Sequence, residues 1–241
     1  MKKIFALLCL FAGFSLSAYA DDIAFLNLLS QAQFKTLSED MGAALSYKAV
    51  SPAEPLGVTG FDLGLEVTST DMSKSSAILA TATGTSSPIK NLVIPKLHAV
   101  KGLPFGIDIG AFVASAPTTN IKLVGGELKV ALIKGGVAIP SVAIRGTMSK
   151  MTGVDQLDFD TRSLDLSISK GFLMLTPYAG VGQVWVTSKG KGTASALTEE
   201  SLTLSKIFLG ANLNFGLANL ALEGDKTGDA TSYSVKFGFR W

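Results

Sequence analysis

Large apolar side chains alternate with small or polar ones, in segments of about ten residues, along most of this chain of 241 residues. The last segment shows the pattern most clearly, because one face carries five large apolar residues, Tyr233, Val235, Phe237, Phe239 and Trp241. A period of two residues is typical of a β-strand whose two faces meet different surroundings. Ten such segments occur between residues 57 and 241, so the pattern predicts an all-β fold.

The links between the ten predicted strands form a second pattern. The longest links, 70–90, 149–157 and 188–200, fall at odd positions in the series, and tight turns at 102–104, 133–137, 171–173 and 215–217 separate them. Outer-membrane barrels have short periplasmic turns, longer external loops and an even number of strands. We therefore predict an antiparallel up-and-down transmembrane β-barrel of about ten strands, with eight or twelve as alternatives.

The first 20 residues have a different composition. Lys2 and Lys3 precede an apolar run over 4–16, and Ala18-Tyr19-Ala20 forms a small-x-small cleavage site. This order predicts a secretory signal peptide over 1–20, because an apolar run of about 13 residues is shorter than the roughly 20 that a spanning helix needs. The one cysteine lies within this run, so the mature chain has no disulfide and no thiolate metal site.

Net charge excludes one class of partner. The chain has 21 Lys and Arg against 19 Asp and Glu, and removal of Lys2 and Lys3 leaves 21 − 2 = 19 of each sign. A neutral mature chain without a basic stretch lacks the electrostatic footprint of a nucleic-acid-binding protein, so we expect no nucleic-acid partner.

The segment 21–56, which precedes the barrel of residues 57–241, has a helical pattern at its start. Asp22 is placed to cap a helix that runs to about Leu37. Residues 41–48 then look strand-like, and the prolines of 51–55 must break regular structure. An eleventh membrane strand would violate the even strand number. Two interpretations stay open: a periplasmic helix and extension beneath the barrel, or a plug inside its lumen.

The signal peptide, the alternating strands and the terminal Phe237-Gly238-Phe239-Arg240-Trp241 together resemble a Gram-negative outer-membrane β-barrel protein. The resemblance covers nearly the whole mature chain but matches no particular family. It implies location in the outer membrane, contact with its lipid, and recognition of the apolar face of the last strand, residues 233–241, by the barrel-assembly machinery. The alternative is a soluble β-sandwich or lipocalin-like barrel, but such proteins turn their apolar face inward.

The polar faces of the predicted strands carry charged residues that we expect to line the lumen, together with one histidine. These are Asp62, Glu66, Lys96, His98, Asp108, Glu127, Lys129, Arg145, Asp165, Lys206, Glu223, Lys236 and Arg240. Six are acidic and six are basic. Buried charges persist only when they are paired or hydrated, so the set predicts either a structural ion-pair network or a narrow polar conduit.

Candidate chemistry is sparse. His98 is the only histidine, which excludes a metal site built from several histidines, and no nucleophile motif or phosphate-binding loop occurs. We predict no catalytic residues, no metal and no cofactor. Three functions remain: a structural or interaction protein with a largely filled polar lumen, a narrow channel or transporter for small solutes gated by the N-terminal segment, and, weakest, an outer-membrane hydrolase that uses His98.

Overall fold

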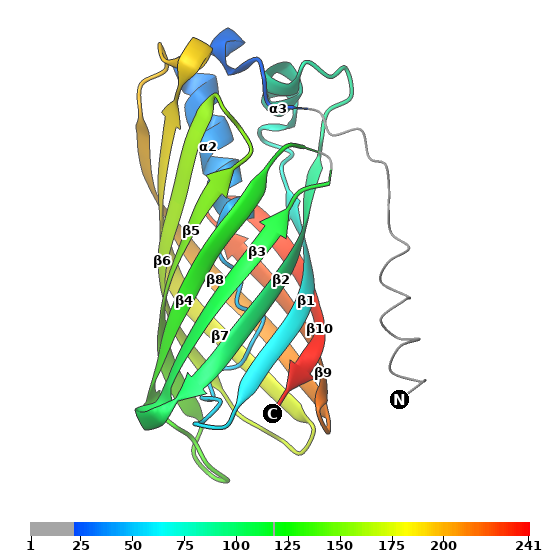
Figure 1. The fold of residues 1–241 in the computed structure, drawn as a ribbon, viewed down its shortest axis with the longest axis vertical. Helices are drawn as coiled ribbons and strands as arrows, with labels where there is room; N and C mark the ends of the chain where they lie inside the picture. Colours follow the sequence, from blue (N-terminus) through cyan, green and yellow to red (C-terminus); the bar gives the residue numbers. More distant parts are fainter. Residues whose placement is uncertain (1–21, 118) are drawn as a thin grey trace.

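In a computed structural model that describes residues 22–117 and 119–241, ten strands form one closed antiparallel barrel (Figure 1). The predicted signal peptide, 1–20, lies outside the described residues. Each strand pairs with its neighbours in the sequence, and the first pairs with the last. The strands are β1 Phe61–Asp71, β2 Asn91–Leu103, β3 Ile107–Ser115, β4 Lys122–Ile133, β5 Ser141–Thr152, β6 Leu157–Ser169, β7 Leu175–Gly190, β8 Glu200–Phe215, β9 Ala218–Thr227 and β10 Ala230–Arg240. The predicted fold class is confirmed.

Pairing between β1 and β10 closes the barrel. The register runs from Asp62 opposite Arg240 to Thr70 opposite Ser232. Next to the Asp62–Arg240 pair, at the end of β10, Phe61 and Trp241 exchange two backbone hydrogen bonds of 3.0 Å, and the centres of their rings lie 5.1 Å apart. The sheet therefore has no unpaired edge over the length of the two strands.

The two faces of the barrel wall differ as the alternation predicts. On β10, Val235 and Phe237 are about half exposed on the outside, whereas Ser234 and Lys236 are buried inside. Every strand carries large apolar side chains on its outer face and small, hydroxyl or charged side chains on its inner face, although Phe112, Tyr178 and Phe208 also point inward and Lys150 and Arg162 point outward. One turn residue departs from the strand pattern, because Phe105, which fits the outward period, lies in a tight turn with a φ of +67°.

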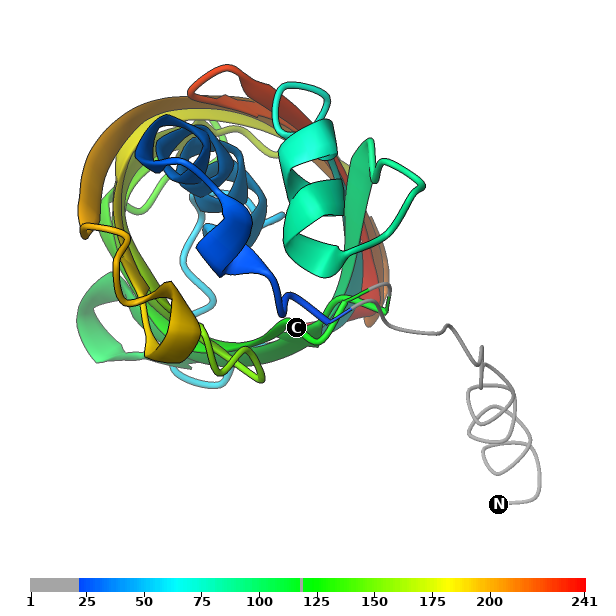
Figure 2. The ribbon, with the colours of Figure 1, turned by 90° about the horizontal axis from the view of Figure 1, so that it is seen from above.

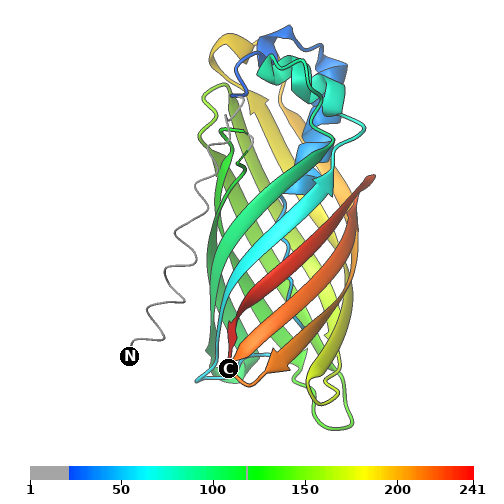
Figure 3. The ribbon, with the colours of Figure 1, turned by 90° about the vertical axis from the view of Figure 1, so that its right-hand side faces the viewer.

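The ends of the barrel are unlike (Figure 3). The end that carries Trp241 has four links of two to seven residues, whereas the opposite end has the two longest links, one that contains helix α3, Ser76–Thr83, and one that contains the 3-10 turn η3, Gly192–Ala194. We call these the short-turn end and the long-loop end. The predicted link 70–90 thus contains a helix that the sequence pattern did not indicate.

The N-terminal helix differs from the prediction in its bounds. Helix α2 spans Gln31–Leu45, and Ser30 caps it in a reciprocal capping box with Gln33. Asp22 is not its cap, and Leu37 is not its end. Residues 41–45 are helical, not strand-like, because three small residues at 42–44 let the helix pack tightly against the barrel wall. A Cβ on Gly42 would lie 2.5 Å from Cγ2 of Val186.

The long-loop end contains a hydrophobic core in which α2 packs against loops and the upper parts of strands. Leu26 and Met41 from the N-terminal segment, Leu79 from α3 and Phe159 from β6 are all buried in this cluster. Among residues 22–117 and 119–241, no helix is both long enough and apolar enough to cross a membrane.

Candidate functional site: the occupied lumen

The chain between α2 and β1 runs through the lumen from the long-loop end to the short-turn end (Figures 1 and 2). We call residues 46–60 the lumen segment. Where it begins, the Leu45 carbonyl accepts a hydrogen bond of 3.2 Å from Oγ of Ser149 on β5. Further along, the Glu54 carbonyl accepts one of 2.9 Å from Nζ of Lys129 on β4. The segment thus lies inside the barrel, and α2 lies at the long-loop end, not beneath the short turns.

All thirteen residues expected in the lumen face inward. Twelve of them are buried, and only Arg240, next to the short-turn end, is half-buried. The structure joins all six bases to acids on the barrel wall. The pairs are Lys96–Glu66 at 2.8 Å, Lys129–Asp108 at 2.9 Å, Arg145–Glu127 at 2.8 Å, Lys206–Asp165 at 3.0 Å, Lys236–Asp62 at 2.9 Å and Arg240–Asp62 at 3.0 Å. Glu223 is the one acid of the set outside these pairs.

The same bases also hold the backbone of the lumen segment. Lys129 donates to the carbonyls of Pro52 and Glu54, at 3.2 and 2.9 Å, and Lys206 donates to that of Tyr47 at 3.1 Å. An extended chain with no neighbouring strand has backbone groups that need other partners when they are buried. Charged side chains of the wall supply those partners, so Lys129 and Lys206 are each bound to an acid and to the segment at once.

Three more charged residues of the wall, Asp108, Arg145 and Lys96, also contact the lumen segment. Asp108 accepts a hydrogen bond of 3.1 Å from the backbone N–H of Leu56, and Arg145 donates one of 3.0 Å to the Ser51 hydroxyl. Lys96 donates to the carbonyl of Lys48 and lies 4.3 Å from the centre of the Tyr47 ring. The segment is therefore tied to the wall along its length by polar contacts.

One buried pair was absent from the predicted set. Lys48 of the lumen segment lies 2.8 Å from Asp225 on β9, and both side chains are almost fully buried. Lys48 also donates to the Ser46 and Thr227 hydroxyls. Asp225 shares the inward phase of Glu223, so the alternation contained the signal for it. Nothing local identified Lys48, because its partner lies 177 residues away in the sequence.

Lys48 balances the charge inside the barrel. With Asp225 the wall contributes 6 + 1 = 7 acids against six bases, and Lys48 brings the bases to seven. The N-terminal segment therefore contributes to the charge balance of the interior, because without Lys48 the wall holds one more acid than base.

The contacts of α2 with the loops hold its outer end. Lys74 pairs with Glu39 at 2.9 Å, and the backbone N–H of Ser75 donates to Asp40 at 2.9 Å. Burial raises the pKa of the Asp40 carboxyl above its ordinary value, and the hydrogen bonds from Ser75 oppose that shift. Gln31 exchanges two hydrogen bonds with Thr198, at 3.1 and 2.9 Å.

His98 has the surroundings of an interior residue. Its Nε2 lies 3.3 Å from Oδ1 of Asp62, and its Nδ1 has no hydrogen-bond partner among the described residues. Within that part of the chain no hydroxyl side chain hydrogen-bonds to the ring, so the geometry assembles no nucleophile beside it. Nor does this part of the chain bring together three or more His, Cys, Asp or Glu side chains placed to hold a metal ion.

No protein-family model and no curated protein sequence matches the chain. Several solved structures do, with low identity. The N-terminal β-barrel domain of OprF from Pseudomonas aeruginosa is 14% identical, with 74% of this chain and 97% of that chain covered and a TM-score of 0.36. The KdgM porin in complex with oligogalacturonate is 8% identical (75% and 99%, TM-score 0.40), and the outer membrane protein OprG from Pseudomonas aeruginosa is 9% identical (79% and 99%, TM-score 0.36). At this identity and TM-score, the functions of these proteins do not carry over.

The Lys48–Asp225 pair generates a stability prediction. Lys48→Met should lower the free energy of unfolding by about 3–5 kcal/mol, because it leaves the Asp225 carboxylate buried without its partner. Reversible urea unfolding in lipid vesicles measures the change. The double variant Lys48→Met/Asp225→Leu should regain most of the loss, and Lys74→Met, which breaks an exposed pair, should cost at most about 1 kcal/mol. Equal losses from Lys48→Met and Lys74→Met would contradict this role of the buried pair.

Proposed function

We propose that this protein is an integral outer-membrane barrel that its own N-terminal segment closes, and that it has a structural or interaction role at the cell surface rather than a role as an open pore. The observation that carries the proposal is the lumen segment, whose backbone and Lys48 are bound by charged groups of the wall. The barrel has ten strands, and a barrel of that size has an interior that side chains and one extended chain can fill.

The outer face supports a place in a lipid bilayer. Every strand exposes large apolar side chains there, for example Leu65, Leu97, Val113, Leu128, Ile144, Leu166, Val181, Leu209, Leu222 and Phe237. A monomeric soluble protein rarely exposes a contiguous apolar patch of this extent. Strands of 9 to 16 residues match the length that a tilted transmembrane strand needs.

The two unlike ends support an orientation. Outer-membrane barrels place short turns in the periplasm and longer links outside, so the long-loop end is assigned to the cell surface. Helices α2 and α3 and the turn η3 form a packed cap at that end, which offers a surface for contact with a ligand or another cell.

A gated narrow channel is the second candidate function. It is favoured by the difference between the two parts of the N-terminal region: α2 is anchored by a hydrophobic core that reaches Tyr47 and Ala49, whereas the rest of the lumen segment is held by hydrogen bonds. Polar contacts of this kind exchange with water if the segment moves, so they permit an open state in which a small solute passes.

Planar-bilayer conductance tests the role of the lumen segment. The intact mature protein should conduct poorly, and deletion of residues 22–56 should create a small conductance. That conductance should be weakly selective, because the remaining wall has seven acids, six bases and no ring of a single sign. A large conductance from the intact protein, or none from a folded deletion variant, would contradict the proposal.

A disulfide separates permanent closure from gating. The hydroxyls of Ser38 on α2 and Ser188 on β7 lie 2.9 Å apart, and the mature chain has no other cysteine, so Ser38→Cys/Ser188→Cys should lock the helix to the wall. Openings in the reduced state would support the gated channel; openings that persist when the disulfide forms would assign the movement to the lumen segment alone, and openings that disappear would show that α2 moves with it. Permanent closure predicts no openings in either redox state.

Surface labelling tests the orientation. An epitope inserted between Asp22 and Ile23 should be labelled on intact cells, because Ile23 bonds to Asn120 at the long-loop end. The same epitope inserted after Gly136, in a short turn, is the matched control and should be labelled only after the outer membrane is permeabilised. The reverse result would mean that the barrel has the opposite orientation.

Assembly depends on the last strand in this proposal. Deletion of Phe239–Trp241 should sharply lower the yield of heat-modifiable barrel in the outer membrane, because it removes the terminal aromatic residues and the last three residue pairs that join β10 to β1 at the short-turn end. Phe239→Ala/Trp241→Ala keeps the backbone pairs and removes only the rings. A normal yield from this double variant would show that the rings are not the assembly signal.

A further inference from the structure

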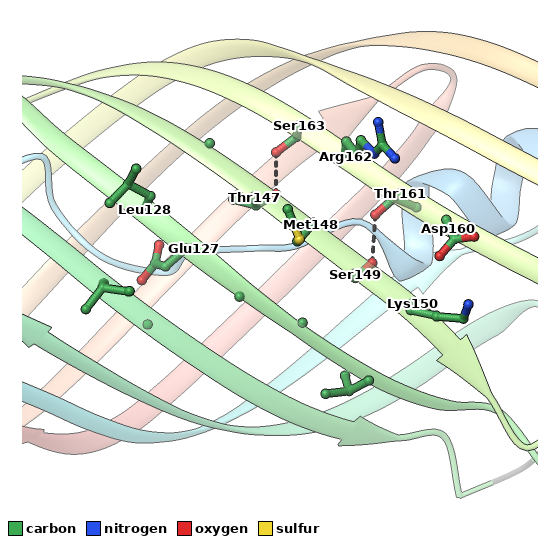
Figure 4. A pocket seen from close by; sticks show the side chains of 16 residues that line it. Glu127, Leu128, Thr147, Met148, Ser149, Lys150, Asp160, Thr161, Arg162 and Ser163 are labelled. Atoms are coloured by element: carbon green, nitrogen blue, oxygen red, sulfur yellow. Dashed lines mark hydrogen bonds between the residues drawn. The ribbon is translucent and has the colours of Figure 1, made fainter.

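The outer face of the barrel contains a groove of about 790 Å³ across β3, β4, β5 and β6 (Figure 4). Two outward-facing glycines cause it, because Gly126 lies opposite Met148 and Gly146 lies opposite Leu128, so each large side chain has a neighbour with none. A Cβ on Gly146 would meet nothing within 4 Å. Leu128 and Met148 are exposed and form apolar walls.

Basic side chains stand at one end of this groove. Lys150 follows Met148 on the same face of β5 in the direction of the long-loop end, and Arg162 on β6 lies directly opposite Met148. Both are exposed, and within the described residues neither forms an ion pair. Asp160, opposite Lys150, also lines the groove, which leaves two bases to one acid there.

Lys150 and Arg162 lie at the upper edge of the apolar outer face of β5 and β6. On the outer face of β5 the side chains below Lys150 are apolar, and Ile144 and Met148 are exposed. On β6 the outward side chains below Arg162 are Leu164, Leu166 and Ile168. The two cations therefore mark the upper edge of the apolar face, at the level where lipid head groups meet acyl chains in the proposed orientation.

We propose that this groove is a binding site for a phosphate-bearing, multiply acylated lipid of the outer leaflet. One acyl chain lies over Gly126 and Gly146, between Leu128 and Met148, and a phosphate group binds Lys150 and Arg162. The site rests on the proposed membrane orientation.

Two physical reasons favour this occupant. An empty depression in an apolar surface lacks contacts on one side, and a flexible acyl chain fills it at little cost. Guanidinium and ammonium groups bind phosphate strongly, and each basic residue near a membrane surface adds about 1 kcal/mol of attraction to anionic lipid. The charges lie beside the apolar groove, as the head group of a lipid lies beside its chains. A zwitterionic lipid would fill the groove, but its own ammonium group neutralises its single phosphate, whereas a lipid with two phosphates offers net negative charge to both cations.

Lipid binding to the full mature protein tests the site. The folded protein is reconstituted in phosphatidylcholine nanodiscs with increasing amounts of lipid A, a diphosphorylated acylated disaccharide, and native mass spectrometry counts the lipid that stays bound. Lys150→Gln/Arg162→Gln should weaken binding about 30-fold, as the loss of two such charges predicts. Gly146→Leu should also weaken it, because the leucine side chain occupies the place of the acyl chain.

Strand β9 offers matched controls away from the groove. Lys226→Gln removes an exposed outward lysine, and Gly224→Leu adds the same side chain to an outward glycine whose Cβ would make only ordinary contact, 3.7 Å from the Tyr233 ring. Both should bind lipid A within about twofold of the unmodified protein, because neither residue lines the groove.

Several outcomes would overturn the proposal: equal lipid A binding by all variants, binding of phosphatidylcholine as tight as that of lipid A, or loss in the charge variant without loss in Gly146→Leu. If discs of the unmodified protein held two copies of the chain and discs of the groove variants held one, the groove would be assigned to contact with a second copy of the chain. Heat-modifiable migration and insertion are measured on the same samples. An inserted barrel without the lipid difference overturns this site alone, whereas failure to insert overturns the proposed function as well.

Discussion

An extended chain inside a barrel has buried backbone groups that no neighbouring strand satisfies, and the rest of this interior depends on meeting that requirement. The carbonyls of Tyr47, Pro52 and Glu54 and the N–H of Leu56 all find partners among charged side chains of the wall. Those charges must in turn be neutralised, because an isolated buried charge is far more costly than a buried pair. Acids on the adjacent strand, or for Lys206 on the strand after next, meet this need, so the wall and the lumen segment stabilise each other.

The two parts of the N-terminal region are held by different forces. Helix α2 buries an apolar face, with residues such as Phe34 and Leu37 against the long-loop core, and its Gly42 allows close approach to Val186. The lumen segment buries fewer and smaller apolar groups, chiefly Tyr47 and Ala49 at its upper end, and along the rest of its length it is held by directional polar contacts. Apolar burial is non-directional and tolerates small shifts, whereas an ion pair specifies one position along the barrel. The helix anchors the segment, and the Lys48–Asp225 pair and the hydrogen bonds fix its register.

The outer face obeys a different constraint. Lipid supplies no hydrogen bonds, so polar groups there must be few, and all backbone groups must be satisfied within the closed sheet. The exchange of hydrogen bonds between Phe61 and Trp241 completes that closure. Glycines matter on such a surface because they have no side chain: Gly126 and Gly146 leave a depression that only lipid or another protein can fill. Lys150 and Arg162 make one end of that depression basic, whereas the rest of it is apolar.

The sequence by itself determined the strands, their two faces and the inward position of thirteen polar residues. The reason is that the direction of a side chain on a strand is a local property with a period of two, as Asp62 and Lys236 show on the two closing strands. Asp225 followed from the same period and was overlooked, and the capping box of Ser30 and Gln33 was present in the sequence although Asp22 was preferred as the cap. Only the tertiary structure decided where the segment after α2 lies. A periplasmic extension and a lumen segment have the same local pattern, and the choice depends on Lys48 meeting Asp225 and on donors from strands β2, β4, β5 and β8, contacts that exist only once the barrel has closed.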